Sequence, residues 1–151
     1  ENGRGIFTLV KTSNPSSGQL QDLKTEDGSR VCEHVAELVS EWGSSCIGKY
    51  GYSSVGAVVG ATYPEEARVL RKKMPHAIIL VPGYGAQGGN AASGAVNFNA
   101  EGMGAIVNAS RSIMYAYKAE KRAGKYTEEQ YAEAAREEAI EMSRAITAAI
   151  S

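Results

Sequence analysis

The sequence has little of what marks several classes of protein. Its two cysteines, Cys32 and Cys46, are too few for a disulfide framework, so both are expected to be reduced thiols. No apolar run reaches the ~18 residues that a membrane-spanning helix needs. The formal net charge is only -1, which indicates neither a nucleic acid nor an anionic membrane as a partner. We therefore expect a soluble cytoplasmic protein.

Metal-binding and targeting patterns are also lacking. Neither of the two histidines, His34 and His76, has a partner at metal-ligand spacing, so no metal site is predicted. The segment from Glu1 to Arg4 has no initiator methionine and no signal-peptide pattern. Because this polar start leads directly into a strand-like run, we expect residues 1–151 to form one partial domain of a longer protein.

What the sequence does contain is a strand-then-helix pattern repeated four times. Each strand-like run is almost continuously apolar, as in parallel strands buried on both faces. The predicted strands are Gly5–Lys11, Ser54–Gly60, Ala77–Val81 and Gly104–Asn108. Helices are predicted over Val31–Trp42, from Pro64 to about Met74, over Ala91–Asn99, over Ser112–Arg122, and after a capping box at Thr127.

Alternating strands and helices predict an α/β fold with a parallel sheet. Two architectures fit: an open doubly wound sheet, or part of a (βα)8 TIM barrel. Four units would make half of such a barrel, whose usual length is about 250 residues. In both architectures, ligands bind at the carboxyl ends of the strands.

The loop after the third strand carries the strongest signal. Four of the seven residues from Gly83 to Gly89 are glycine, which is costly in chain entropy unless exposed backbone is needed. Backbone amides in such a loop can hold an anion, and Gln87 adds a donor and an acceptor. The alternative is a flexible surface turn.

The loops after the other strands are also polar. After the first strand, Thr12, Ser13 and Asn14 could bind the edge of a heterocycle or simply form an Asn-Pro turn. The second is followed by Thr62, which is explained by helix capping alone. The fourth leads through Ser110 and Arg111 into a helix, and helix amides beside a guanidinium suit a phosphate. Barrels often hold phosphate after strands seven and eight, so the chain is predicted to be a C-terminal half.

Four segments, in order and spacing, resemble orotidine 5'-phosphate decarboxylase, and in particular its longer bacterial branch. They are KTSNPSS, VVGATYPEE, LVPGYGAQGG and IVNASRSI, of which PGxGAQGG is the most specific. The resemblance covers the whole chain but only the second half of the family barrel. It implies a fold of the ribulose-phosphate-binding barrel type: four parallel strands with outer helices.

The resemblance implies a role for each matching residue. Ser13 would hydrogen-bond the pyrimidine, and Pro82 would line the ring pocket. Gln87 would reach between the pyrimidine and the 5'-phosphate, with Gly88 and Gly89 supplying loop backbone. Arg111 would bind the phosphate with the backbone amides of Ser110 and Arg111, although the family usually has glycine in place of Ser110. Thr12 and Asn14 are weaker candidates.

The reaction implied is decarboxylation of orotidine 5'-phosphate to UMP in pyrimidine biosynthesis, without a metal or an organic cofactor. The catalytic lysine and its flanking aspartates belong to a DxKxxD motif expected in the missing N-terminal half. No catalytic residue is therefore predicted in this chain, and the isolated chain is expected to be inactive. The full enzyme is expected to be a homodimer.

One literal match to DxKxxD occurs at Asp22, Lys24 and Asp27. The family motif ends a buried strand, whereas polar residues precede this match and Gly28 follows it, so we predict a solvated loop instead. Two alternatives to the decarboxylase remain: another phosphate-binding barrel enzyme, or a non-catalytic half-barrel that only binds or dimerises.

Overall fold

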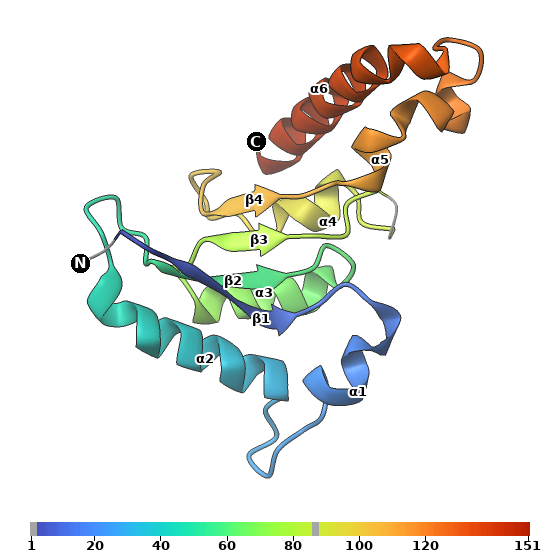
Figure 1. Cartoon of the computed structure of the whole chain (residues 1–151). Helices are drawn as coiled ribbons and strands as arrows, with labels where there is room; N and C mark the ends of the chain where they lie inside the picture. Colours follow the sequence, from blue (N-terminus) through green and yellow to red (C-terminus); the bar gives the residue numbers. More distant parts are fainter. Residues whose placement is uncertain (1–2, 86–87) are drawn as a thin grey trace.

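A computed structural model describes residues 3–85 and 88–151 of the chain (Figure 1). Its strands are β1 (Ile6–Lys11), β2 (Val55–Val59), β3 (Ile79–Val81) and β4 (Ala105–Val107). They form one parallel sheet in the order β1-β2-β3-β4. The four predicted strands are confirmed, with ends shifted by at most two residues.

The helices occupy the connections between the strands and the carboxyl-terminal region. They are α1 (Gly18–Gln21), α2 (Val31–Gly43), α3 (Pro64–Lys73), α4 (Ala91–Ala95), α5 (Arg111–Met114) and α6 (Tyr131–Ile150). Short 3-10 turns lie at Pro15–Ser17, Ser44–Cys46, Ala116–Lys118, Glu120–Arg122 and Glu128–Gln130.

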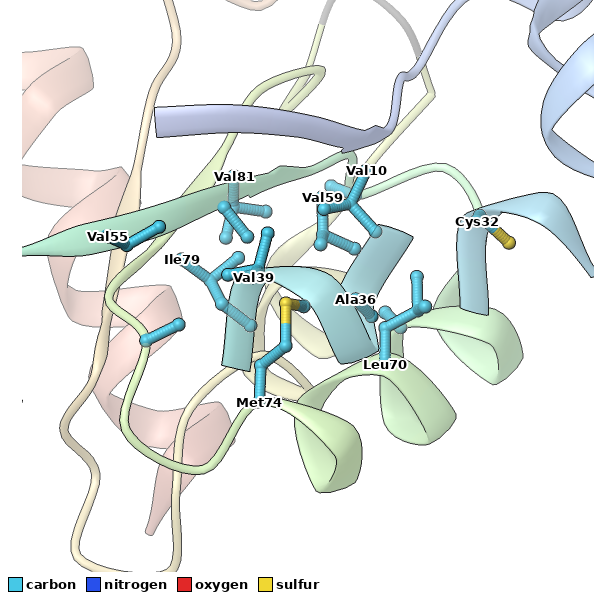
Figure 2. Packing of buried hydrophobic residues seen from close by; sticks show 14 residues of the cluster. Val10, Cys32, Ala36, Val39, Val55, Val59, Leu70, Met74, Ile79 and Val81 are labelled. Atoms are coloured by element: carbon cyan, nitrogen blue, oxygen red, sulfur yellow. The ribbon is translucent and has the colours of Figure 1, made fainter. Parts of the chain in front are cut away.

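The hydrophobic core lies between one face of the sheet and helices α2 and α3 (Figure 2). The strands contribute Val10, Val59, Ile79 and Val81, and the helices contribute mostly small residues together with Leu70 of α3. Met74, directly after α3, completes the core. Both of these large side chains are completely buried. Truncating one of them would cost about 2–5 kcal/mol of stability, because buried apolar contacts are lost and the surrounding core closes the cavity only partly.

The opposite face of the sheet is open. Leu9 is paired with Val58, Val58 with Leu80, and Leu80 with Ile106, so these four residues form one row across the sheet. Because successive residues of a strand point to opposite faces, the row points away from the helical core. Leu9 and Ile106, on the two edge strands, are 64% and 53% exposed. An uncovered face and two open edges are what half of a barrel leaves.

Helix α2 buries only part of its apolar stripe, which consists of Val31, Val35, Leu38, Val39 and Trp42 at helical spacing. Val39 is buried and Val35 packs against the core, and the other buried residues are Cys32, Ala36 and Gly43. Small side chains let the helix approach the sheet closely, as at Gly43, where an added Cβ would lie 2.5 Å from Ser53 Oγ. Leu38 and Trp42 are 40% and 49% exposed.

Three local expectations were wrong. The helix expected over Ala91–Asn99 ends at Ala95. The helix expected over Ser112–Arg122 ends at Met114 and is followed by two 3-10 turns. The capping box expected before α3 does not form, because the Thr62 hydroxyl donates to the Ser13 carbonyl instead (3.4 Å) and Tyr63 is the N-cap. The capping box at Thr127 is present, and α6 begins four residues later.

Helix α6 is held to the preceding turns by an ion-pair cluster. Arg122 Nη2 lies 2.9 Å from both Glu138 Oε2 and Glu141 Oε2, and Lys121 Nζ lies 2.6 Å from Glu138 Oε2. Arg122 is only 4% exposed, so this pairing compensates a charge that would otherwise be costly to bury. The helix itself packs across α4 and α5.

Candidate functional site

The loops that follow the four strands meet at one end of the sheet (Figure 1). Backbone hydrogen bonds continue past the strand ends and join each loop to the next. The bonds run from Gly60 N–H to Lys11 O (2.8 Å), from Ala61 N–H to Pro82 O (2.9 Å) and from Asn108 N–H to Val81 O (2.9 Å). All four polar segments recognised in the sequence therefore lie side by side.

The loop after β1 places Ser13 over the end of β2. An added Cβ at Gly60 would lie 2.8 Å from Ser13 Cβ, so the strand end accepts this approach only because residue 60 is glycine. Thr62 and Tyr63, which lie after β2, contact the same loop. Their hydroxyl groups each donate to its backbone at 3.4 Å, to the carbonyls of Ser13 and Asn14. Ser13 is thus held in a defined, half-buried position.

The glycine-rich loop after β3 folds back on itself. Gly85 N–H donates to Gly89 O (2.7 Å), and Gly89 N–H donates to Gly83 O (3.1 Å). Gly83, Gly85 and Gly88 have φ angles of 92°, 75° and 92°, a left-handed conformation that side chains rarely adopt. The glycines are therefore required by the backbone path of the loop. Gln87 lies outside the described residues.

Pro82, Ser110 and Arg111 line one hollow of about 160 Å³ between the loops after β3 and β4. The rest of its wall is Gly83, Tyr84, Asn108 and Ala109. The start of α5 closes against the glycine-rich loop, since a Cβ at Gly85 would lie 3.1 Å from Ser112 Oγ. The structure thus brings together three of the predicted binding residues, with Gly89 in the same loop.

The electrostatics of this hollow favour an anion. Arg111 is exposed, and within residues 3–85 and 88–151 its guanidinium makes no hydrogen bond or ion pair, so its donors are available. Burial raises the pKa of the Tyr84 phenol, which therefore stays neutral and able to donate. Tyr84 was not predicted as a site residue, and its place inside the glycine-rich loop is the signal that could have indicated it.

Ser13 does not line the hollow. It lies one loop away, against Gly60. The next residue, Ala61, donates its backbone N–H to Pro82 O and so connects the two loops. The predicted residues accordingly fall into two adjacent regions. One is at the ends of β1 and β2, and the other is at the ends of β3 and β4.

The DxKxxD match at residues 22–27 does not form one cluster. Asp22 pairs with Lys11 at 2.7 Å, whereas Lys24 and Asp27 are exposed on a small hairpin closed by a bridge between Lys24 and Arg30. A hydrogen bond from Thr25 and one from the Ser29 backbone lower the pKa of Asp27 to about 2, so this carboxylate stays ionised in solvent. The geometry is that of a solvated turn.

Two kinds of feature are lacking in the part of the chain that the structure describes. No group of three or more histidine, cysteine, aspartate or glutamate side chains there is placed to hold a metal ion. Among the same residues, no helix is both long enough and apolar enough to cross a membrane.

Comparison with known proteins identifies the family. Residues 1–126 match the model of the Orotidine 5'-phosphate decarboxylase / HUMPS family. The orotidine 5'-phosphate decarboxylase of Rhodopirellula baltica is 51% identical over 139 residues, covering 92% of this chain and 46% of the relative. That of Clostridium perfringens strain SM101 is 43% identical over 150 residues, covering 99% of this chain and 50% of the relative. The chain thus spans about half the length of these curated relatives.

Solved structures agree with the sequence comparison. The OMP decarboxylase of Leishmania donovani superimposes with a TM-score of 0.67 at 31% sequence identity, covering 95% of this chain and 48% of that one. The four parallel strands and their helices therefore match half of a decarboxylase TIM barrel, which decides between the two architectures left open by the sequence. The chain belongs to the orotidine 5'-phosphate decarboxylase family.

Proposed function

We propose that this chain is the carboxyl-terminal half of an orotidine 5'-phosphate decarboxylase and that it binds the 5'-phosphate and the pyrimidine of the substrate. The observation that carries the proposal is the hollow in which Arg111 and Ser110 meet Pro82 and the glycine-rich loop. Its place at the ends of the third and fourth strands suits the seventh and eighth strands of a complete barrel, where phosphate commonly binds.

The phosphate would be bound chiefly by Arg111. A guanidinium can donate two parallel hydrogen bonds to phosphate oxygens, and such charge-assisted bonds are roughly twice as strong as neutral ones. The backbone amides of Ser110 and Arg111 would supply further donors. Gly88 and Gly89, whose amides donate to Gly85 O and Gly83 O, would shape the loop around the phosphate. The neutral phenol of Tyr84 adds one more donor at the wall of the hollow.

The pyrimidine would lie between the hollow and the loop after β1. Ser13 would hydrogen-bond its polar edge, and Pro82 would contact the ring. Gln87, assigned by the family resemblance, would reach from the ring to the phosphate. The short path from Ser13 through Gly60 and Ala61 to Pro82 supports this arrangement, because one nucleotide can touch both regions.

The chemistry would use the lysine and aspartates of the amino-terminal half, with orotidine 5'-phosphate as substrate and UMP as product. Binding energy from the remote phosphate can stabilise the transition state at the pyrimidine, so phosphate binding contributes to catalysis. The isolated chain, which lacks that lysine, would not turn over. The complete enzyme would act as a homodimer and without a metal or organic cofactor.

The test uses a complete barrel, made by placing the amino-terminal half of the Rhodopirellula baltica relative before this chain. Decarboxylation is followed by loss of the orotidine 5'-phosphate absorbance. We expect turnover by the complete barrel and none by this chain alone. A complete barrel that folds but neither turns over nor binds UMP would overturn the proposal and favour a half-barrel with only a binding or assembly role.

A further inference from the structure

The loop that carries Ser13 is closed at its base by two consecutive side-chain pairs. At the end of β1, Lys11 Nζ donates to Asp22 Oδ1 at 2.7 Å. The next residue, Thr12, donates its backbone N–H to Gln21 Oε1 at 3.0 Å, and Gln21 Nε2 donates to Thr12 Oγ1 at 3.2 Å. These bonds join the end of β1 to the end of α1, and residues 13–20 form the loop between them.

Lys11 is an unusual residue to find at this place. Its side chain is completely buried, and it pairs in register with Val59, whose side chain belongs to the helical core. A buried ammonium is costly unless it is paired. Asp22 provides the opposite charge, and the Tyr63 ring lies 4.4 Å from Lys11 Nζ. The burial of Lys11 therefore fixes where Asp22, and with it the end of the loop, must lie.

The loop itself has little to hold it in shape. Its regular structure is one 3-10 turn followed by the four-residue α1, and helices this short are unstable alone. Leu20, its largest apolar residue, is 63% exposed and adds little packing. The two pairs at the base thus constrain the loop together with the contacts at Ser13 and Asn14 and the burial of Ser17.

We propose that the Lys11–Asp22 and Thr12–Gln21 pairs are a positioning device that sets where Ser13 meets the pyrimidine. The proposal rests on the proposed function, in which Ser13 binds the pyrimidine. The pairs touch no substrate and act through the loop. They lie at the β1 end of the site and line no part of the phosphate hollow. Disturbing them should therefore alter recognition of the pyrimidine and leave phosphate binding unchanged.

Gln21 gives the sharpest variants in the complete barrel, because its side chain is only half-buried and its loss should not prevent folding. Gln21→Ala removes the acceptor for the Thr12 amide, whereas Gln21→Glu keeps an acceptor there. Gln19→Ala, on the same helix and exposed, is the matched control. We expect Gln21→Ala to lower kcat/KM for orotidine 5'-phosphate about fivefold, the effect of one hydrogen bond, with Gln21→Glu and Gln19→Ala close to wild type.

A second readout separates positioning from a general loss of structure. Ribose 5-phosphate, used as a competitive inhibitor, reports on the phosphate hollow without a pyrimidine. Its inhibition constant should stay unchanged in Gln21→Ala. Equal weakening of inhibitor and substrate would overturn the proposal, because the pairs would then support the whole site. Asp22→Asn, which leaves Lys11 without its ionised partner, should give a larger loss with the same selectivity.

The double variant Ser13→Ala/Gln21→Ala completes the test. If Gln21 acts through Ser13, its substitution should have little further effect once the Ser13 hydroxyl is gone. Independent, multiplying effects would contradict the positioning role. A neutral Ser13→Ala would refute the pyrimidine role of Ser13. A harmful Ser13→Ala beside a neutral Gln21→Ala would refute only the positioning device.

Discussion

Replacing Arg111 with alanine in the complete barrel should separate binding from folding. The side chain is exposed and makes no ion pair within the described part of the chain, so its loss should change the free energy of unfolding by at most about 0.5 kcal/mol. In the complex, the same change would remove a charge-assisted contact to a phosphate. That loss should cost about 2–4 kcal/mol, because the phosphate would be left partly unpaired.

In kinetic terms, this cost is a decrease in kcat/KM of about 30-fold to about 1000-fold. The assay compares orotidine 5'-phosphate with orotidine, which has no phosphate for Arg111 to bind. Against orotidine, the Arg111→Ala variant should match the wild type. Arg144→Ala is the control, since Arg144 is an exposed arginine of α6 outside the hollow. If Arg111→Ala slowed both substrates equally, Arg111 would be a structural residue and the phosphate site would be misplaced.

Three further predictions follow from other parts of the molecule. In the complete barrel, Lys24→Ala should leave turnover unchanged, because Lys24 lies exposed on a hairpin; a kinetic assay in which the variant lost activity would show that this lysine is the catalytic one. The isolated chain should self-associate in sedimentation experiments through its open sheet face, and Leu9→Lys should reduce this; a cooperatively folded wild-type monomer would argue against the open face. The hydrogen bond from Arg122 lowers the pKa of Glu141 from 4.5 to about 2, so the stability from this pair should be complete above about pH 4.5 and lost as the pH falls towards about 2. Denaturant titrations should show that the free energy of unfolding depends less on acid pH in Glu141→Gln than in the wild type. An unchanged pH dependence would disprove the coupling.

The strands were predictable because burial on both faces leaves a plain signal in the sequence. Parallel strands under helices need apolar residues throughout, and runs such as SVGAVVG contain little else. The strand order did not follow from this pattern, because a doubly wound sheet and part of a barrel fit the same alternation of strands and helices. Local pattern therefore predicted the strands but not their order.

The helices were less predictable because long-range contacts decide which residues they bury and where they end. Cys32, Ala36 and Gly43 of α2 face the core because a close approach to the sheet requires small residues, which a pattern based on large apolar side chains overlooks. Helical spacing likewise continues through Ser112–Arg122. The chain turns there instead, and Arg122 pairs with glutamates that follow it by 16 and 19 residues.

In the candidate site, the glycine content of the loop after β3 was predictable from its backbone conformation, whereas the side-chain pairing was not. Positive φ angles at Gly83, Gly85 and Gly88 explain why the loop after β3 is rich in glycine, and that richness is visible in the sequence. The pairing of Lys11 with Asp22 is not visible, because the two residues are separated by 11 positions and one of them belongs to the DxKxxD match. Only the folded loop shows that this aspartate serves the base of the loop.

The central claim is that this chain holds the phosphate and the pyrimidine of the nucleotide. A crystal structure of the complete barrel with UMP tests it most directly. We expect a phosphate oxygen within hydrogen-bond distance of the Arg111 guanidinium, at about 2.7–2.9 Å, and the pyrimidine edge against Ser13. A phosphate bound away from the hollow beside Pro82 and Ser110, or a pyrimidine that does not reach the loop after β1, would contradict it.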